Sequence, residues 1–260
     1  MTMTYTVTAH CMGTMPLPGP EVFWMQAWDE WFDAHFWMLV ARSAEATVVI
    51  NTGPPAQLDE LNAMWRGSHP SGDKWFRRSA RQHPDAALAS IGVDPASVTH
   101  VVFTPLVTYT LGGIELFPNA QLCFSRRGWI EDVLAPPLPH HLPREIFVPD
   151  PVLSHLLFDA RERVRLLEDG DEVASGIRVW ETGVHHRSSL AVEIDTALGR
   201  VVATDAAFSY RNVEQNIALG IGESYEEAMR SYARLRREAD VLVPLYEPDV
   251  ITRHPGGRIA

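Results

Sequence analysis

The sequence predicts an α/β layered fold in a single domain spanning residues 1–260, on three observations. Short apolar stretches typical of strands recur along the whole chain, helical stretches lie between them, and four of the strands end in a polar or turn-forming segment. Strands and helices mixed in this way pack as layers around a common core. A chain of 260 residues can bury such a core without disulfides or metals.

The first half of the chain opens with strands. Alternation over residues 4–10 predicts the first strand, and residues 35–41 and 46–50 look like a strand pair. The same reasoning predicts strands at 100–104 and 121–125 and helices at 57–66, 85–91, 127–134 and 151–160.

In the second half, strands are predicted at 177–181, 190–194, 200–204 and 240–245. The clearest helix begins at Ser224, which forms a capping-box pattern with Glu227. An apolar stripe with helical spacing follows, formed by Tyr225, Ala228, Met229 and Tyr232. The best candidate for a linker is the Pro-rich stretch 136–143, although eight residues fit a surface loop equally well.

Composition excludes several classes of function. A net charge of −11 disfavours binding to nucleic acid or to an anionic membrane. The two cysteines, Cys11 and Cys123, are too few for a disulfide framework and fit a reducing cytosol. The N-terminus lacks the features of a signal peptide, and the longest apolar run, 36–41, is too short to cross a bilayer. We therefore expect a cytoplasmic protein.

The four strand ends point to one site. Apolar runs stop at 51–53, 104–105, 204–205 and 246–247, where the sequence reads Asn-Thr-Gly, Thr-Pro, Thr-Asp and Tyr-Glu. Loops at one rim of a sheet commonly carry function, although every strand must also end somewhere.

Five segments carry a resemblance to a known family. They are INTGPP (50–55), THVVFTPLVTYTLGGIELFPNAQ (99–121), TGVHHRSSLAV (182–192), VVATDAAFSYRN (201–212) and LVPLYEPDVITRHP (242–255). In order and spacing, the chain resembles the metallo-β-lactamase superfamily from about Val40 to His254, and most of all the branch around the quorum-quenching acyl-homoserine lactonases. The resemblance implies a four-layer αββα sandwich.

The family's metal motif, HxHxDH, is replaced in this chain. That motif binds two metal ions, which activate a bridging hydroxide. Its four ligand positions match Pro105, Val107, Tyr109 and Thr110. The later ligand positions match His185, Asp205 and Tyr246, so only two of seven retain a family ligand. A catalytic zinc usually needs three protein ligands, and we expect neither a metal nor another cofactor.

The other histidines offer little to rebuild a metal site. Eleven histidines are about twice the usual share, but most stand alone. Two adjacent pairs occur, His140–His141 and His185–His186. Neighbours in a strand point to opposite faces, so such a pair rarely chelates one ion.

The resemblance places a group of residues at one pocket. Its expected catalytic members are His185, Asp205, Tyr246 and Tyr109, and its expected substrate-binding members are Thr104, Thr108, His186, Phe208 and Tyr210. Phe208 stands where the lactonases carry a substrate-positioning tyrosine, and Tyr210 lies two residues further on. We expect the Asp205 carboxylate to hydrogen-bond the His185 imidazole and raise its pKa.

Three functions remain open. The first is a metal-independent enzyme in which His185 is the base, Asp205 orients it, and Tyr246 or Tyr109 stabilises negative charge. Its reaction on a small organic substrate is lactone or ester hydrolysis by analogy, or a lyase, cyclase or isomerase step. The second is a non-catalytic protein that binds a small ligand. The third is a metallo-hydrolase with unusual ligands.

An aromatic segment lies near the N-terminus. Its members are Phe23, Trp24, Trp28, Trp31, Phe32, Phe36 and Trp37. Such a cluster is typical of a core, of a substrate lid or of a homodimer surface.

Overall fold

Two β-sheets pack face to face in this computed structural model, which describes residues 3–135 and 144–260. The first sheet has the order β1–β2–β3–β4–β5–β6 and the second the order β11–β10–β9–β8–β7. The strands of the first sheet are β1 (Thr6–Pro18), β2 (Trp31–Arg42), β3 (Thr47–Ile50), β4 (His100–Phe103), β5 (Gln121–Ser125) and β6 (Val164–Leu167). Those of the second are β7 (Glu172–Ala174), β8 (Ile177–Glu181), β9 (Leu190–Thr196), β10 (Gly199–Thr204) and β11 (Val241–Pro244).

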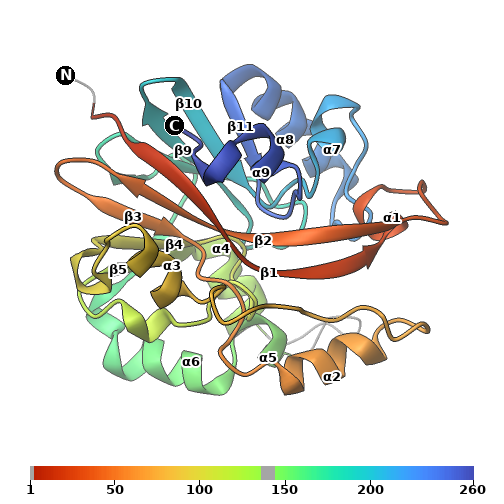
Figure 1. The fold of residues 1–260 in the computed structure, drawn as a ribbon, viewed down its shortest axis with the longest axis horizontal. Coiled ribbons are helices and arrows are strands. Elements are labelled where there is room, and N and C mark those ends of the chain that lie inside the picture. The colour runs from red at the N-terminus through yellow and green to blue at the C-terminus, as the bar shows by residue number, and fades with distance from the viewer. Residues whose placement is uncertain (1–2, 136–143) are drawn as a thin grey trace.

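Helices cover the outer faces of both sheets, which completes the four layers (Figure 1). Helices α2 (Asp59–Gly67), α3 (Pro84–Ser90), α5 (Arg144–Phe147) and α6 (Asp150–Ser154) lie against the first sheet. Helices α7 (Tyr210–Glu214), α8 (Tyr225–Glu238) and α9 (Val250–Arg253) lie against the second. The short helices α1 (Gly19–Val22) and α4 (Arg126–Gly128) follow β1 and β5. The αββα sandwich that the resemblance implied is confirmed.

Alternation along the strands builds two cores. In β2, Leu39 and Ala41 point between the sheets, whereas Met38 and Val40 point toward the helices of the first sheet. All four side chains are almost completely buried, as expected for a strand covered on both faces. The sheet interior is therefore apolar, and polar side chains that converge on one site lie at the strand ends.

Several predicted elements differ from the structure. Strand β1 runs to Pro18, well beyond residue 10, and β6, β7 and α7 were not predicted. The segments predicted as helices at 127–134 and 151–160 each continue as a π-helical turn, at Trp129–Leu134 and His155–Asp159. The Pro-rich stretch 136–143, with His140–His141, lies outside the described residues.

The helix predicted after Ser224 is α8, and the Ser224 hydroxyl accepts a hydrogen bond from the Glu227 amide at 3.2 Å. The Glu227 carboxylate does not complete the capping box but binds Arg127 and the Val184 amide. Tyr225 leaves the predicted apolar stripe, since 54% of it is exposed. Within the described residues, no helix is both long and apolar enough to cross a membrane.

Candidate active site

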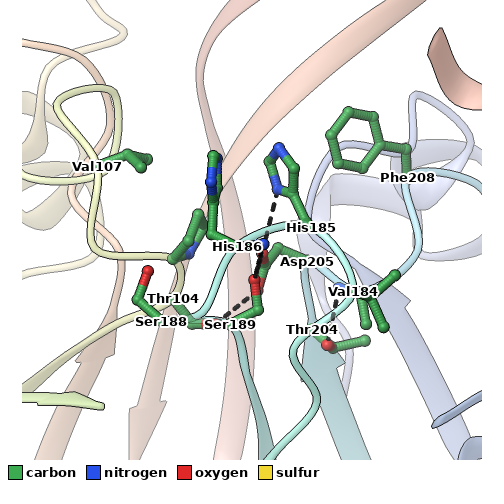
Figure 2. A network of polar contacts seen from close by, with 12 residues as sticks. Thr104, Val107, Val184, His185, His186, Ser188, Ser189, Thr204, Asp205 and Phe208 are labelled. Atoms are coloured by element: carbon green, nitrogen blue, oxygen red, sulfur yellow. Dashed lines mark hydrogen bonds and ion pairs between the residues drawn. The ribbon is translucent and has the colours of Figure 1, made fainter. Parts of the chain in front are cut away.

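His185 and His186 occupy a loop between β8 and β9, and both rings point the same way (Figure 2). Their ring centroids lie 4.1 Å apart. The expectation that these neighbours face opposite ways was wrong, because they do not lie in a strand. The loop turns through Gly183 (φ +58°) and Val184 (φ +69°), and a β-branched residue with positive φ is rare. Glu227 steadies this turn by accepting a hydrogen bond from the Val184 amide.

His185 is paired with Asp205, as the sequence predicts, because the loop after β10 brings that carboxylate beneath the ring. The His185 Nδ1 atom lies 3.2 Å from Asp205 Oδ2. The same oxygen accepts a hydrogen bond from the Ser189 hydroxyl, and Thr104 donates to Oδ1 at 2.6 Å. With the carboxylate ionised, Nδ1 carries the ring proton and Nε2 keeps its lone pair.

Tyr109 and Tyr246 complete the aromatic surroundings of His185. Tyr246 follows β11, its backbone oxygen accepts a hydrogen bond from the His35 amide of β2, and its ring meets the His185 ring at 5.9 Å. The Tyr109 hydroxyl lies 3.3 Å from His186 Nε2. The Tyr246 hydroxyl is buried, and its hydrogen-bond partner among the described residues is the Tyr109 hydroxyl. The two phenols therefore lie together on the His185 side of the site.

The loop that replaces the metal motif is closed by its own hydrogen bonds. The Thr110 hydroxyl binds the backbone oxygens of Pro105 and Val107 at 2.7 and 2.8 Å. The Leu106 amide binds the Ser188 hydroxyl at 2.9 Å, which ties this loop to the histidine loop. Thr110 is therefore a structural residue of this loop, and Tyr109 is held facing His186.

These side chains line a cavity of about 260 Å³ with mostly apolar walls. The lining residues are Met15, Leu17, Glu21, Phe36, Trp65, Ser68, Lys74, Tyr109, Ile146, His185, His186, Phe208, Ile221 and Tyr246. Of the nine predicted site residues, five therefore lie on the cavity wall: His185, His186, Tyr109, Tyr246 and Phe208.

The other four predicted residues lie elsewhere. Asp205 and Thr104 are fully buried behind His185 and reach the cavity only through it. Thr108 lines a separate hollow beside Pro55 and His155. Tyr210 lines neither the cavity nor this hollow, and its ring packs under the Arg253 guanidinium, 3.6 Å away. None of Thr104, Thr108 and Tyr210 lines this cavity, and the substrate-binding role expected of them stays a prediction.

The sequence analysis missed several contributors to the site, among them Glu21, Trp65, Lys74 and Ser189. One signal was available for Lys74, because it is the only lysine in a chain with 22 basic residues. Phe36 belongs to the aromatic N-terminal segment, in which Phe23, Phe36 and Trp37 are buried and Trp24, Trp28 and Trp31 are exposed.

Burial dominates the electrostatics of the pair. Burial, together with the smaller effect of the Lys74 charge, lowers the pKa of His185 to about 3. The expectation that the pKa of His185 is raised was wrong, because loss of solvation disfavours the charged imidazole. Burial raises the pKa of Asp205 to about 6, against the Ser189 and Thr104 hydrogen bonds and the nearby His186. Burial also raises the pKa of Tyr246 and Tyr109 well above the ordinary value, so both stay hydrogen-bond donors.

The donor set does not fit the two-metal centre of the family. Among residues 3–135 and 144–260, no three His, Cys, Asp or Glu side chains are grouped to hold a metal ion. Both carboxylate oxygens of Asp205 are engaged in contacts with Thr104, Ser189 and His185. The phenols of Tyr109 and Tyr246 stand at positions where the family has a carboxylate and an imidazole ligand. His185 and Asp205 alone fall short of the usual three ligands.

Comparison with known proteins supports the fold. The chain is 28% identical over 176 residues to metallo-beta-lactamase domain-containing protein 1 of Mus musculus, a match over 67% of this chain and 56% of that protein. The chain thus spans little more than half of this curated relative. No protein-family model matches the chain.

Solved structures agree over almost the whole length. An N-acyl homoserine lactone hydrolase with the product N-hexanoyl-L-homoserine at its catalytic metal centre superposes with a TM-score of 0.78, at 18% identity, over 97% of both chains. A dizinc quorum-quenching lactonase gives a TM-score of 0.67, at 15% identity, over 98% of this chain and 92% of its own. The protein therefore has the metallo-β-lactamase fold, which the resemblance found in its sequence implied.

Proposed function

We propose that this protein is a metal-independent hydrolase that opens an ester or lactone of a small, largely apolar substrate. The observation that carries the proposal is the His185–Asp205 pair on the wall of an apolar cavity, with the Nε2 side of the imidazole left for a bound molecule. The hydrolase class is an analogy with the lactonases of the same fold, whereas the chemistry is argued from this chain's own residues.

In the proposed reaction, His185 Nε2 removes a proton from a water molecule as its oxygen attacks the substrate carbonyl. The carbon–oxygen bond to the leaving group then breaks, and the imidazolium returns the proton to that oxygen. One water is consumed, and an acid and an alcohol are formed. Asp205 stabilises the imidazolium between these steps and holds the ring in the productive tautomer.

Tyr246 is the proposed donor to the negative oxygen that forms during attack. Its hydroxyl is buried on the cavity wall next to Tyr109, and in the proposed step its proton turns from Tyr109 to the oxygen on which charge develops. Tyr109 is a second donor, positioned through His186. Among mostly apolar walls such hydrogen bonds are stronger than in bulk water.

A second candidate function is non-catalytic binding of an apolar ligand. It is favoured by one observation, the low pKa of His185, because a weakly basic imidazole removes protons less readily. The same pair also supports proton transfer within a substrate, as in a lyase, cyclase or isomerase, and analysis of the products separates that chemistry from hydrolysis.

The test is turnover of aliphatic 4-nitrophenyl esters and γ-lactones by the wild-type protein and by His185→Ala. We expect the substitution to lower kcat at least a hundredfold, in the range that general acid–base catalysis contributes. His155→Ala is the matched control, because this histidine lies outside the cavity with Asp159 as its partner. Equal turnover by His185→Ala and the wild type contradicts the proposal, and ligand binding without turnover supports the second candidate.

A further inference from the structure

The cavity wall carries a partly buried ion pair, Lys74 with Glu21, that the proposed reaction does not use. Only 6% of Lys74 is exposed. Its ammonium donates to both carboxylate oxygens of Glu21, at 2.9 and 2.7 Å, and lies 4.7 Å from the centre of the Trp65 ring. The ammonium is thus neutralised on one side and covered by an aromatic face on the other.

The composition of the chain makes this position unusual. Lys74 is the only lysine, and the other 21 of the 22 basic residues are arginines. A charge taken out of water is costly unless it is paired, and here the pair is made inside a ligand-sized cavity. The ion pair also links α1, which carries Glu21, to the segment after α2, which carries Lys74.

The ion pair gives the cavity a second polar group besides His185 and Tyr246. Apolar residues such as Leu17 and Phe36 line the same cavity. A molecule bound in this cavity with its carbonyl at His185 therefore shares the cavity with Lys74 and Glu21, and the charge state of the pair acts on the rest of the molecule.

We propose that the Lys74–Glu21 ion pair determines specificity, so that the intact pair admits uncharged apolar molecules and disfavours apolar acids. The inference rests on the proposed function only in placing the substrate in this cavity. Two of the three ammonium donors are directed at Glu21, and an incoming carboxylate must lie next to the Glu21 carboxylate as well. An uncharged group meets no such repulsion. Neutralising Glu21 leaves a buried, unbalanced ammonium, which binds a carboxylate by charge-assisted hydrogen bonds.

The test compares two probes of the same shape, octanamide and octanoate, by titration calorimetry at pH 8. We expect the wild-type protein to bind octanamide more tightly than octanoate. Glu21→Gln keeps the side-chain shape, and it should strengthen octanoate binding at least tenfold while changing octanamide binding less than threefold. Adding Lys74→Met to that variant should abolish the gain.

Glu214→Gln is the matched control, because it removes the carboxylate of another ion pair, with Arg253, outside the cavity. Lys74→Gln provides a second route if Glu21→Gln does not fold: it should weaken octanoate binding and retain octanamide binding. The inference is overturned if wild-type protein prefers octanoate or binds neither probe, or if Glu21→Gln leaves octanoate binding unchanged. Neither probe is an ester, so the binding test does not depend on turnover. If the protein is inactive but Glu21→Gln strengthens octanoate binding, only the proposed function is refuted. If the protein is active but Glu21→Gln does not strengthen octanoate binding, only this inference is refuted.

Discussion

Thr104 donates a 2.6 Å hydrogen bond to Asp205 and thereby joins the two sheets behind the His185–Asp205 pair. Thr104 follows β4 of the first sheet, and Asp205 follows β10 of the second. The Thr104 hydroxyl also accepts from the Leu190 amide at 2.7 Å, so its position is fixed from the β9 side. The carboxylate that orients His185 is therefore tuned by a residue that does not touch the cavity.

This bond predicts the pH dependence of turnover. Asp205 assists His185 only when ionised, so activity should rise with pH through about 6, the pKa of this carboxyl. Thr104→Val removes a hydrogen bond that lowers the pKa, and the rise should move upward by ~1–2 pH units. A pH profile of kcat/KM measures the shift. Thr196→Val, which alters a buried threonine of β9 far from the pair, should leave the profile in place; an unmoved profile in Thr104→Val contradicts the assignment.

The pair also predicts opposite effects of pH on stability. The pKa of His185 is about 3 in the folded protein against an ordinary 6.5, so acidification below 6.5 protonates the unfolded chain first and destabilises the fold. The pKa of Asp205 is about 6 against an ordinary 3.8, so the folded protein takes up this proton first and gains stability between pH 6 and 4. Each effect is on the order of 3 kcal/mol at pH 4, and they nearly cancel.

Removing one residue of the pair should therefore reveal the effect of the other on the pH dependence of stability. Relative to the wild type, His185→Asn should gain unfolding free energy as the pH falls from 6.5 to 4, and Asp205→Asn should lose it. Urea denaturation at four pH values gives both slopes. If the two variants respond to pH with the same sign, the two proton affinities are not those described.

The turn before the histidines predicts a further difference. Gly183 has a φ of +58°, and a Cβ on it would collide with the Glu227 carboxylate, which holds the Val184 amide. Gly183→Ala should cost ~1–2 kcal/mol of stability from the left-handed backbone and lower kcat about tenfold or more, because His185 moves with the turn. Gly170 has a φ of +87° and open space around it, so Gly170→Ala should show the same kind of strain without the loss of kcat. Equal kcat in both variants would show that the turn does not set the position of His185.

Metal removal gives the fourth prediction. The ligand set described above does not fit a two-metal centre, so elemental analysis of the purified protein should find Zn, Fe and Mn far below one ion per chain. Dialysis against a strong chelator should leave turnover unchanged, with a metal-dependent lactonase treated in parallel as the control. Stoichiometric metal that is lost in Asp205→Asn, together with activity, would instead identify a metallo-hydrolase with unusual ligands.

Local pattern predicted much of the fold, and its failures have physical causes. Strands β5 and β8 match the predicted ranges end to end, because short apolar runs bounded by polar residues have few alternatives. Strand β1 was cut short because Gly13, Pro16 and Pro18 disfavour strands, yet β1 is an edge strand, where proline is tolerated. Helix α7 has only five residues, too few to show a helical period.

The site divides in a similar way. His185 and Asp205 could be paired because they stand at matching family positions, and the structure places them in contact. Lys74 and Glu21 are 53 residues apart and belong to no motif, so only the folded chain brings them together. The low pKa of His185 was also out of reach, because it depends on how completely the ring is buried.

Because the chain has a single lysine, amine labelling of Lys74 can report on access to the cavity. Amine-directed reagents find one side-chain amine in this chain, and it is shielded by Glu21 and Trp65 in the folded protein. Mass spectrometry of protein labelled for different times would therefore measure how often the Lys74 Nζ atom becomes accessible, without an engineered probe. A ligand that covers Lys74 would lower the rate of labelling.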